Sequence, residues 1–176
     1  MTAGTLFPSV LGAQFAALDP CLRWVHSGES RRLRGSVTVE RGSSVVARLL
    51  GVLASLPAAM RDAPIEVRIE VSGTGEKWVR LFAGQHLMVS GLRRDGDLLV
   101  ERLGPAALKF RLVVRDGALE WVLEHIAVFG IALRRKWFRI AATIKARDGR
   151  YHFAVNSELI GAGRIVRYEG LLDATA

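Results

Sequence analysis

Hydrophobic and polar residues alternate with a period of two along most of the chain after residue 63. The first such segment, 64–72, carries an apolar β-branched residue at every second position: Ile65, Val67, Ile69 and Val71. This alternation predicts strands with one buried face and one solvated face. Similar segments follow near 77–83, 86–93, 98–103, 108–115, 118–128, 138–147, 150–159 and 164–172. Because turn sequences recur between them at short intervals, we expect an antiparallel meander.

Residues 1–60 have a different pattern, in which apolar residues recur at helical spacing. A helix is expected over 8–18, and Asp19-Pro20 can cap and begin a second short helix. Residues 33–41 alternate and predict the first strand. Ser43-Ser44 can cap a helix over 45–56 that is apolar on nearly every side. We therefore expect that helix to be buried or to lie against an apolar partner.

The tripeptide Arg-Asp-Gly occurs three times, and two copies make testable hairpin predictions. Asp-Gly favours a two-residue turn because both positions tolerate a positive φ. A turn at Asp116-Gly117 gives apolar partners on one face and one ion pair on the other: Val114 with Leu119, Leu112 with Trp121, Phe110 with Leu123, and Lys109 with Glu124. A turn at Asp148-Gly149 does the same: Ala146 with Tyr151, Ile144 with Phe153, Ala142 with Val155, and Arg139 with Glu158. A one-residue slip would exchange the faces of one strand.

Three further turns are predicted at Asp95-Gly96, at Thr74-Gly75 and at the three-residue loop 161–163. The first pairs Leu92 with Leu99 and Met88 with Leu103, with Ser90 opposite Glu101 between them. The second pairs Val71 with Trp78, Val67 with Phe82 and Ile69 with Arg80. The third pairs Leu159 with Ile165.

These registers place five polar residues on faces that are otherwise apolar. Arg80 falls between Trp78 and Phe82, Glu101 falls between Leu99 and Leu103, and the 161–163 loop turns Ser157, Arg167 and Glu169 inward. A charge on an inner face must be paired or must line a cavity. A structural ion pair, or a misassigned face, explains them more simply than a ligand site. They are nevertheless the candidate ligand-binding residues: Arg80, Glu101, Ser157, Arg167 and Glu169.

Composition narrows the class of protein without naming a reaction. The 176 residues, half of them apolar, fit one domain, with helices and the first strand in 1–60 and the meander in 64–172. The net charge of +8 invites a nucleic-acid partner, but the basic residues are dispersed along the chain, and we favour a solvated basic surface. The single cysteine, Cys21, permits no disulfide framework, and the N-terminus does not resemble a signal peptide, so we expect a cytoplasmic protein.

Chemistry-bearing motifs are scarce. His26, His86, His125 and His152 are scattered, with none of the usual zinc-ligand spacings, and no nucleophile elbow or phosphate loop is present. We therefore assign no catalytic residue, metal or cofactor. Segment 126–139 joins an apolar run to a basic aromatic cluster and could contact a membrane surface. We favour a buried strand that continues into a solvated loop.

Several stretches, in their order along the chain, carry a resemblance that covers nearly its whole length. They read LFPSVLGAQFAALDPCLRWVHSG, GSVTVERG, EKWVRLFAG, LLVERLGP, VVRDGALEW, GIALRR and DGRYHFAVNSELIGAGRIVRYEGLL. Together they resemble an uncharacterised bacterial domain of unknown function that is often found C-terminal to a saccharopine-dehydrogenase-like Rossmann module. The resemblance implies no catalytic residue. It implies an accessory or ligand-presenting role near an oxidoreductase. Because this sequence shows no dinucleotide-binding module, it would act alone or with a separate chain.

The predicted fold is α+β and β-rich: an antiparallel meander of about nine to ten strands, curled into a barrel or half-barrel, with N-terminal helices packed on it. The leading functional hypothesis is a non-enzymatic binding module for an apolar or lipid-like ligand enclosed by the sheet. One alternative is an interaction domain that docks a Rossmann-type oxidoreductase. Another is an enzyme whose polar site uses Arg80, Glu101, Arg167 and Glu169, which requires these four side chains to converge.

Overall fold

The computed structural model describes residues 5–174, which form one continuous sheet and several short helices. The strands are β1 (Arg31–Arg41), β2 (Met60–Ser72), β3 (Gly75–Phe82), β4 (His86–Asp95), β5 (Leu98–Leu103), β6 (Ala106–Arg115), β7 (Ala118–Val128), β8 (Ile131–Leu133), β9 (Phe138–Arg147), β10 (Arg150–Leu159) and β11 (Gly163–Asp173). The helices are α1 (Leu6–Leu11), α2 (Pro20–Val25) and α3 (Val45–Leu53), with 3₁₀ turns η1 (Gly12–Ala17) and η2 (Arg135–Trp137).

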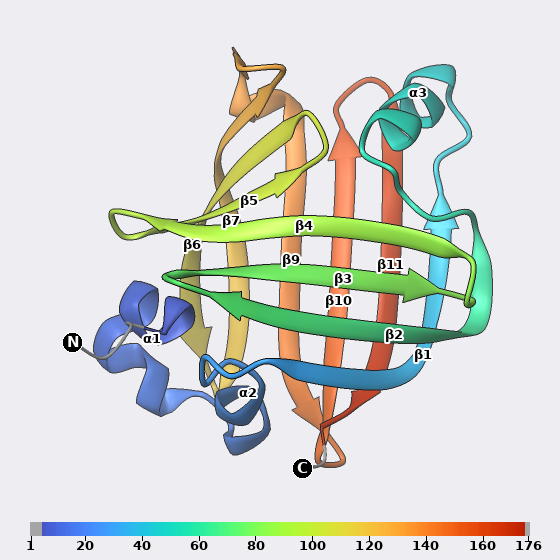
Figure 1. Cartoon of the computed structure of the whole chain (residues 1–176). Helices are drawn as coiled ribbons and strands as arrows, with labels where there is room; N and C mark the ends of the chain where they lie inside the picture. The colour runs from blue at the N-terminus through green and yellow to red at the C-terminus, as the bar shows by residue number, and fades with distance from the viewer. Residues whose placement is uncertain (1–4, 175–176) are drawn as a thin grey trace.

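The sheet closes into an antiparallel barrel of ten strands (Figure 1). Around the barrel the order is β1, β2, β3, β4, β5, β6, β7, β9, β10 and β11, and β11 pairs again with β1. Strand β8 is an addition that pairs with β7. The β-rich barrel with N-terminal helices that the sequence predicts is therefore confirmed, and closure removes the exposed edges that an open sheet would present.

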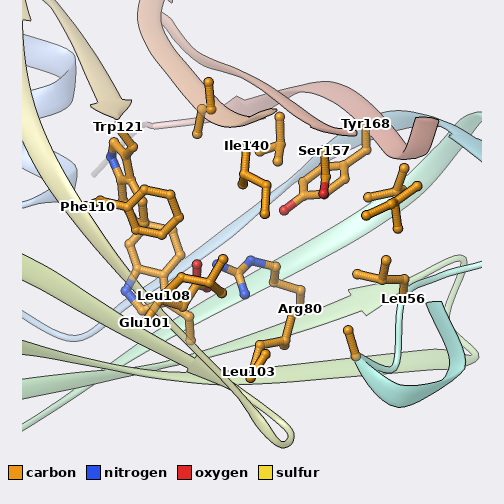
Figure 2. A pocket seen from close by; sticks show the side chains of 18 of the residues that line it. Leu56, Arg80, Glu101, Leu103, Leu108, Phe110, Trp121, Ile140, Ser157 and Tyr168 are labelled. Atoms are coloured by element: carbon orange, nitrogen blue, oxygen red, sulfur yellow. The ribbon is translucent and has the colours of Figure 1, made fainter. Parts of the chain in front are cut away.

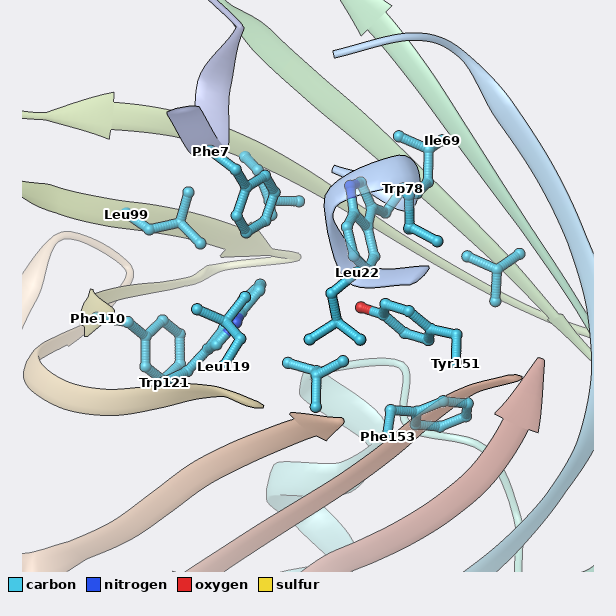
Figure 3. Packing of buried hydrophobic residues seen from close by; sticks show 14 of the residues in the cluster. Phe7, Leu22, Ile69, Trp78, Leu99, Phe110, Leu119, Trp121, Tyr151 and Phe153 are labelled. Atoms are coloured by element: carbon cyan, nitrogen blue, oxygen red, sulfur yellow. The ribbon is translucent and has the colours of Figure 1, made fainter. Parts of the chain in front are cut away.

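The N-terminal helices close one end of the barrel, as the blue segment of Figure 1 shows. Figure 3 shows Phe7 and Leu22, both fully buried, among aromatic side chains of the barrel wall. The ring of Phe7 lies 6.3 Å from that of Trp78 and 6.0 Å from that of Trp121. The backbone N–H of Asp19 donates to Gly117 O, which ties the helices to the β6–β7 turn. We call residues 6–26 the plug.

The helices of the plug differ in one respect from the prediction. The helix expected over 8–18 is split into α1 and the 3₁₀ turn η1, and Gly12 at the junction has a φ of 54°, outside the helical region. The second helix begins as predicted, because Asp19 accepts a hydrogen bond from Cys21 N at 2.8 Å and Pro20 occupies the first turn.

Two of the predicted hairpins have the expected register. All predicted apolar pairs around Asp116-Gly117 and Asp148-Gly149 are present, and Arg139 lies opposite Glu158. One predicted pair is wrong: a β-bulge between Lys109 and Phe110 moves Lys109 opposite His125. The side chains follow the new register, since Lys109 Nζ pairs with Asp95 at 2.7 Å while Glu124 pairs with Arg111.

The turns predicted at Asp95-Gly96 and Thr74-Gly75 are wrong by two residues in register. The chain turns at Gly96-Asp97 and at Gly73-Thr74, so that Asp95 pairs with Leu98 and Ser72 with Gly75. In each turn a glycine with positive φ takes the first loop position. A slip of two residues preserves the faces of both strands, because the side-chain period is two. The inward assignment of Arg80 and Glu101 therefore survives.

The predicted 161–163 loop is wrong in a way that matters more. Leu159 pairs with Gly163 instead of Ile165, and a bulge at Ser157/Glu158 then sets Ser157 opposite Val166. This shift of one residue exchanges the faces of β11. Val166, Tyr168, Gly170 and Leu172 thus lie on the inner face, and Arg167, Glu169 and Leu171 lie on the outer face.

Helix α3 begins as predicted, with Ser44 Oγ accepting from Ala47 N at 3.1 Å, but most of it is not buried, so only the second predicted placement, against an apolar partner, stays open. Only Ala47 and Gly51 are buried, while Val45 and Val52 are 73% and 76% exposed. The helix lies across the barrel end opposite the plug (Figure 1). Within residues 5–174, no helix is long and apolar enough to cross a membrane.

Candidate functional site

The barrel encloses an apolar cavity of about 190 Å³ between the plug and α3. Its walls come from most strands of the barrel, and Figure 2 shows Leu103, Leu108, Phe110 and Ile140 directed into it. Leu50, Leu53 and Leu56, on or just after α3, line the end that lies opposite the plug. A volume of this size is comparable with the roughly 150 Å³ cavity that holds one benzene molecule in another protein.

Arg80 is the charged side chain at the centre of this apolar surface. Its Nη1 donates to Ser90 Oγ at 2.9 Å, and its Nη2 lies 3.3 Å from Glu101 Oε1. The side chains of Arg80 and Glu101 are 10% and 14% exposed, so the ion pair is largely removed from water. The guanidinium also lies 5.1 Å from the ring centroid of Trp78. The pair is charge-balanced and borders the cavity, as Figure 2 shows.

Two hydroxyl groups lie on the cavity wall across from Arg80. Ser157 of β10 and Tyr168 of β11 both line the cavity, and Figure 2 shows the two side chains next to each other. Burial raises the pKa of Tyr168 to about 12, so its hydroxyl stays protonated and can donate a hydrogen bond at neutral pH. Together with Arg80 and Glu101, they give the cavity four polar side chains that a bound molecule could reach.

The floor of the cavity is formed where barrel aromatic residues meet the plug. Trp78, Trp121 and Tyr151 line the cavity from this side. Tyr151 Oη lies 3.1 Å from Nε2 of His26, a fully buried residue of the plug whose ring is stacked near Trp78. Burial lowers the pKa of His26 to about 3, so this histidine is neutral at physiological pH. The plug therefore seals this end with apolar rings and one uncharged hydrogen-bonded pair.

A buried carboxyl group, Glu76, lies beside this floor. It is 5% exposed, and its Oε2 accepts a hydrogen bond from Trp78 Nε1 at 2.8 Å. Burial raises the pKa of Glu76, although the hydrogen bond from Trp78 opposes that shift. Its role here is to fix the orientation of the Trp78 ring, because it satisfies the only donor that the indole has.

The structure brings together three of the five sequence-predicted site residues and separates the other two. Arg80, Glu101 and Ser157 line the cavity. Arg167 and Glu169 lie on the outer surface, where they pair with each other at 3.5 Å, because the register of β11 differs by one residue from the prediction. Glu169 also accepts from His152 Nε2 at 2.7 Å, and this bond lowers the pKa of Glu169.

The convergent enzymatic site considered from the sequence is therefore not formed. Its four charged residues divide into an inner pair and an outer pair on opposite faces of the wall. Within residues 5–174, no group of three or more histidine, cysteine, aspartate or glutamate residues is arranged to hold a metal ion.

Sequence reasoning missed Ser90 as the partner of Arg80, and it missed Tyr168 altogether as a cavity residue. The signal for Ser90 was present, because Ser90 alternates with Met88 and Leu92 on the inner face of β4. Tyr168 can be assigned to the inner face only from the observed β10–β11 register, because the predicted register placed it outside.

Fold and cavity define the chain as a closed antiparallel β-barrel with a plugged end and an apolar interior that carries a buried ion pair. In sequence, residues 18–172 match the family described as Domain of unknown function (DUF4166). The chain belongs to this family. Compared with the curated proteins, its sequence matches none. The match begins at Leu18, so α1 and η1 of the plug lie before the family region.

Proposed function

We propose that this barrel is a binding module for an apolar or lipid-like small molecule. The observation that carries the proposal is the cavity itself, an interior space whose surface is almost entirely apolar with a few convergent polar groups. Pockets of that composition are typical of small-molecule sites. A closed barrel filled only as a structural core would leave few voids larger than a water molecule.

The polar groups favour a particular kind of ligand. Arg80 already has Glu101 as a counter-ion, so the pair carries no net charge to attract an ionised head group. The hydroxyls of Ser157 and Tyr168 and the free donors of Arg80 can instead form hydrogen bonds with a neutral oxygen. We therefore infer an acyl or alkyl chain that ends in an alcohol, ester or amide, with the chain against Leu108, Phe110 and their neighbours.

The test begins with native mass spectrometry and solvent extraction of the purified protein, followed by melting curves with straight-chain alcohols and carboxylates of increasing length. A ligand present at 100 times its Kd stabilises a protein by about 2.7 kcal/mol, which raises Tm by about 5–10 °C for a chain of this size. Alcohols should stabilise more than carboxylates of equal length. A protein that carries no extractable molecule and whose Tm no chain length raises would contradict the proposal.

A matched pair of variants separates the cavity from the outer wall. Ser157→Phe places a ring in the cavity from β10, whereas Thr143→Phe places the same ring on the exposed face of β9. We expect Ser157→Phe to abolish the ligand-induced rise in Tm and Thr143→Phe to retain it. Equal responses of the two variants would place binding elsewhere.

A further inference from the structure

The apolar side chains that the fold leaves exposed are concentrated at the barrel end opposite the plug. Within residues 5–174, eleven large hydrophobic side chains are exposed. Nine of them belong to three segments of this end: Val45, Val46, Leu49, Val52 and Leu53 of α3, Phe129, Ile131 and Trp137 around β8, and Ile160 in the β10–β11 turn. The other two, Leu87 and Val89, lie on the outer face of β4.

These segments form one continuous surface, which we call the rim: residues 42–56, 104–105, 129–137 and 159–165. Backbone hydrogen bonds connect its parts, from Phe129 N to Pro105 O, from Ile160 N to Trp137 O and from Gly42 N to Ile165 O. Figure 1 shows α3, the β5–β6 turn and the β10–β11 turn together at this end. Because Leu50, Leu53 and Leu133 of the rim also line the cavity, the exposed apolar surface continues into its mouth.

The charge of the rim has a single sign. Its four segments contain five basic residues and no acidic one: Arg48, Arg134, Arg135, Lys136 and Arg164. Arg164 pairs with Glu40 just below the rim, and Arg135 donates to Leu123 O. Arg48, Arg134 and Lys136 are exposed beside the apolar side chains. The guanidinium of Arg134 lies 5.9 Å from the ring centroid of Trp137, so cation and indole occupy the same part of the surface.

We propose that the rim docks on a bilayer surface that contains anionic lipids, with the mouth of the cavity facing the membrane. Apolar side chains that enter the boundary between head groups and acyl chains, together with flanking cations, are the combination that holds peripheral proteins on such surfaces. An indole such as that of Trp137 is favoured at the same depth. A second copy of this chain fits poorly as the occupant, because two rims of the same charge would repel each other.

Docking goes beyond the proposed binding of a ligand and does not depend on it. If both hold, an apolar molecule passes between the bilayer and the cavity without crossing water. The two proposals fail separately, because the cavity-filled variant Ser157→Phe should still dock on vesicles.

The test is flotation of the whole chain with phosphatidylcholine vesicles that contain or lack phosphatidylglycerol. We expect binding to the anionic vesicles that is at least about tenfold stronger than to the neutral ones, because each cation near an anionic surface adds to the affinity. Binding should weaken as the salt concentration rises, since the attraction is screened. Equal recovery with both vesicle types at low salt, or no recovery with either, would overturn the proposal.

Four variants locate the contact. Leu49→Glu/Val52→Glu removes exposed apolar side chains of α3, and Arg134→Glu/Lys136→Glu reverses two charges; each should weaken vesicle binding at least about tenfold. The matched controls, Leu87→Glu/Val89→Glu on β4 and Arg23→Glu/Arg115→Glu on α2 and β6, make the same changes of charge outside the rim and should bind like the wild type. All eight mutated positions are exposed, so a comparison of melting curves is enough to check folding. Rim variants that bind vesicles as strongly as the wild type would refute membrane docking. So would sedimentation experiments in which the wild type is a dimer and the rim variants are monomers.

Discussion

Arg80 and Glu101 show how two charges can be held inside an apolar wall. Each is costly to remove from water, and their attraction offsets that cost only while both remain. Ser90 supplies an additional hydrogen bond at 2.9 Å, and Trp78 contributes its ring face. Replacing one partner therefore has a different consequence from replacing both.

We expect Arg80→Met to lower the free energy of unfolding by about 3 kcal/mol, because Glu101 then remains in the wall without its counter-ion. The double variant Arg80→Met/Glu101→Met should recover most of that loss, since two apolar side chains of similar length replace the pair. Urea denaturation of the wild type, both single variants and the double variant measures the cycle. A double variant no more stable than Arg80→Met would mean that the pair is not coupled.

His26 makes the stability of the plug depend on pH. Its pKa is about 3 in the folded chain and about 6.5 in the unfolded chain, so the unfolded state takes up the proton first. The contribution of neutral His26 is complete above pH 6.5 and is lost as pH falls from 6.5 toward 3. The slope in this window is about 1.4 kcal/mol per pH unit.

Between pH 7 and pH 4.5, the wild type should therefore lose about 3 kcal/mol through His26 alone. His26→Leu should show a correspondingly flatter decline, even if its stability at pH 7 is lower because Tyr151 Oη loses its partner. Guanidinium denaturation at the two pH values measures the difference. The control, His125→Gln, changes an exposed histidine and should lose stability between the two pH values as the wild type does. If His26→Leu lost as much stability as the wild type, His26 would not be the source of the pH dependence.

At the scale of the element, the hairpins show what a sequence pattern can predict. Asp116-Gly117 and Asp148-Gly149 follow the predicted pairing because a two-residue turn there agrees with both flanking strands. At Asp95-Gly96 the turn position was wrong, yet the inner face was right, because the error was an even number of residues. At 161–163 the bulge left the predicted register wrong by one residue. Arg167, predicted on the inner face, therefore lies on the outer surface. A bulge has no local sequence signal of comparable strength.

Helix α3 illustrates a different limit. Its nearly uniform apolar character predicted burial or an apolar partner, and nine residues placed across a barrel end have only one face to bury within the chain. The buried face is marked by Ala47 and Gly51, which allow the close approach of β11 and of the Arg41 side chain. Packing within the chain does not explain why the remaining apolar side chains of α3 are exposed. This exposure is the basis of the docking proposal.

The position of α3 depends on a contact between Gly51 and Arg41. Arg41 Nη1 donates to Leu56 O and Pro57 O at 3.1 Å each, and a Cβ added at Gly51 would lie 1.6 Å from Arg41 Nη2. Gly51→Ala should therefore displace Arg41 and destabilise the chain by about 1 kcal/mol, because lost charged hydrogen bonds outweigh the better helix propensity of alanine.

In an Arg41→Ala background, the same Gly51→Ala change should stabilise the chain by up to about 1 kcal/mol, because only the propensity gain remains. Thermal denaturation of the four proteins gives the coupling between the two sites. The same sign of effect in both backgrounds would show that Arg41 does not hold the helix.

At the scale of the molecule, barrel closure rests on pairings that no hairpin pattern predicts. Strand β1 pairs with β11, although most of the chain lies between them in sequence. Strand β7 pairs with β9 and not only with its sequence neighbour β8. Consecutive strands could be paired from their turns, but the choice between an open and a closed sheet depends on twist and on strand length over the whole chain.

The seam between β7 and β9 has the shortest ladder of paired residues in the barrel, and we expect hydrogen exchange to be fast next to it. Strands β7 and β9 pair only from Leu119–Val122 to Ala141–Ile144, whereas β2 and β3 pair over eight residues each. Beyond this short ladder, β7 turns to β8, and Phe138 and Ile140 are paired on the β10 side. Local opening is easiest where few backbone hydrogen bonds must break.

We expect amides in 129–140 to exchange at least about tenfold faster than those in 65–82, measured by mass spectrometry of peptic peptides. The seam borders the cavity through Leu133, Phe138 and Ile140, so its opening would also give a ligand a side entrance next to the rim. A bound ligand should then slow exchange in 129–140 more than in 65–82. Uniform protection around the barrel would instead leave the mouth at α3 as the route to the cavity.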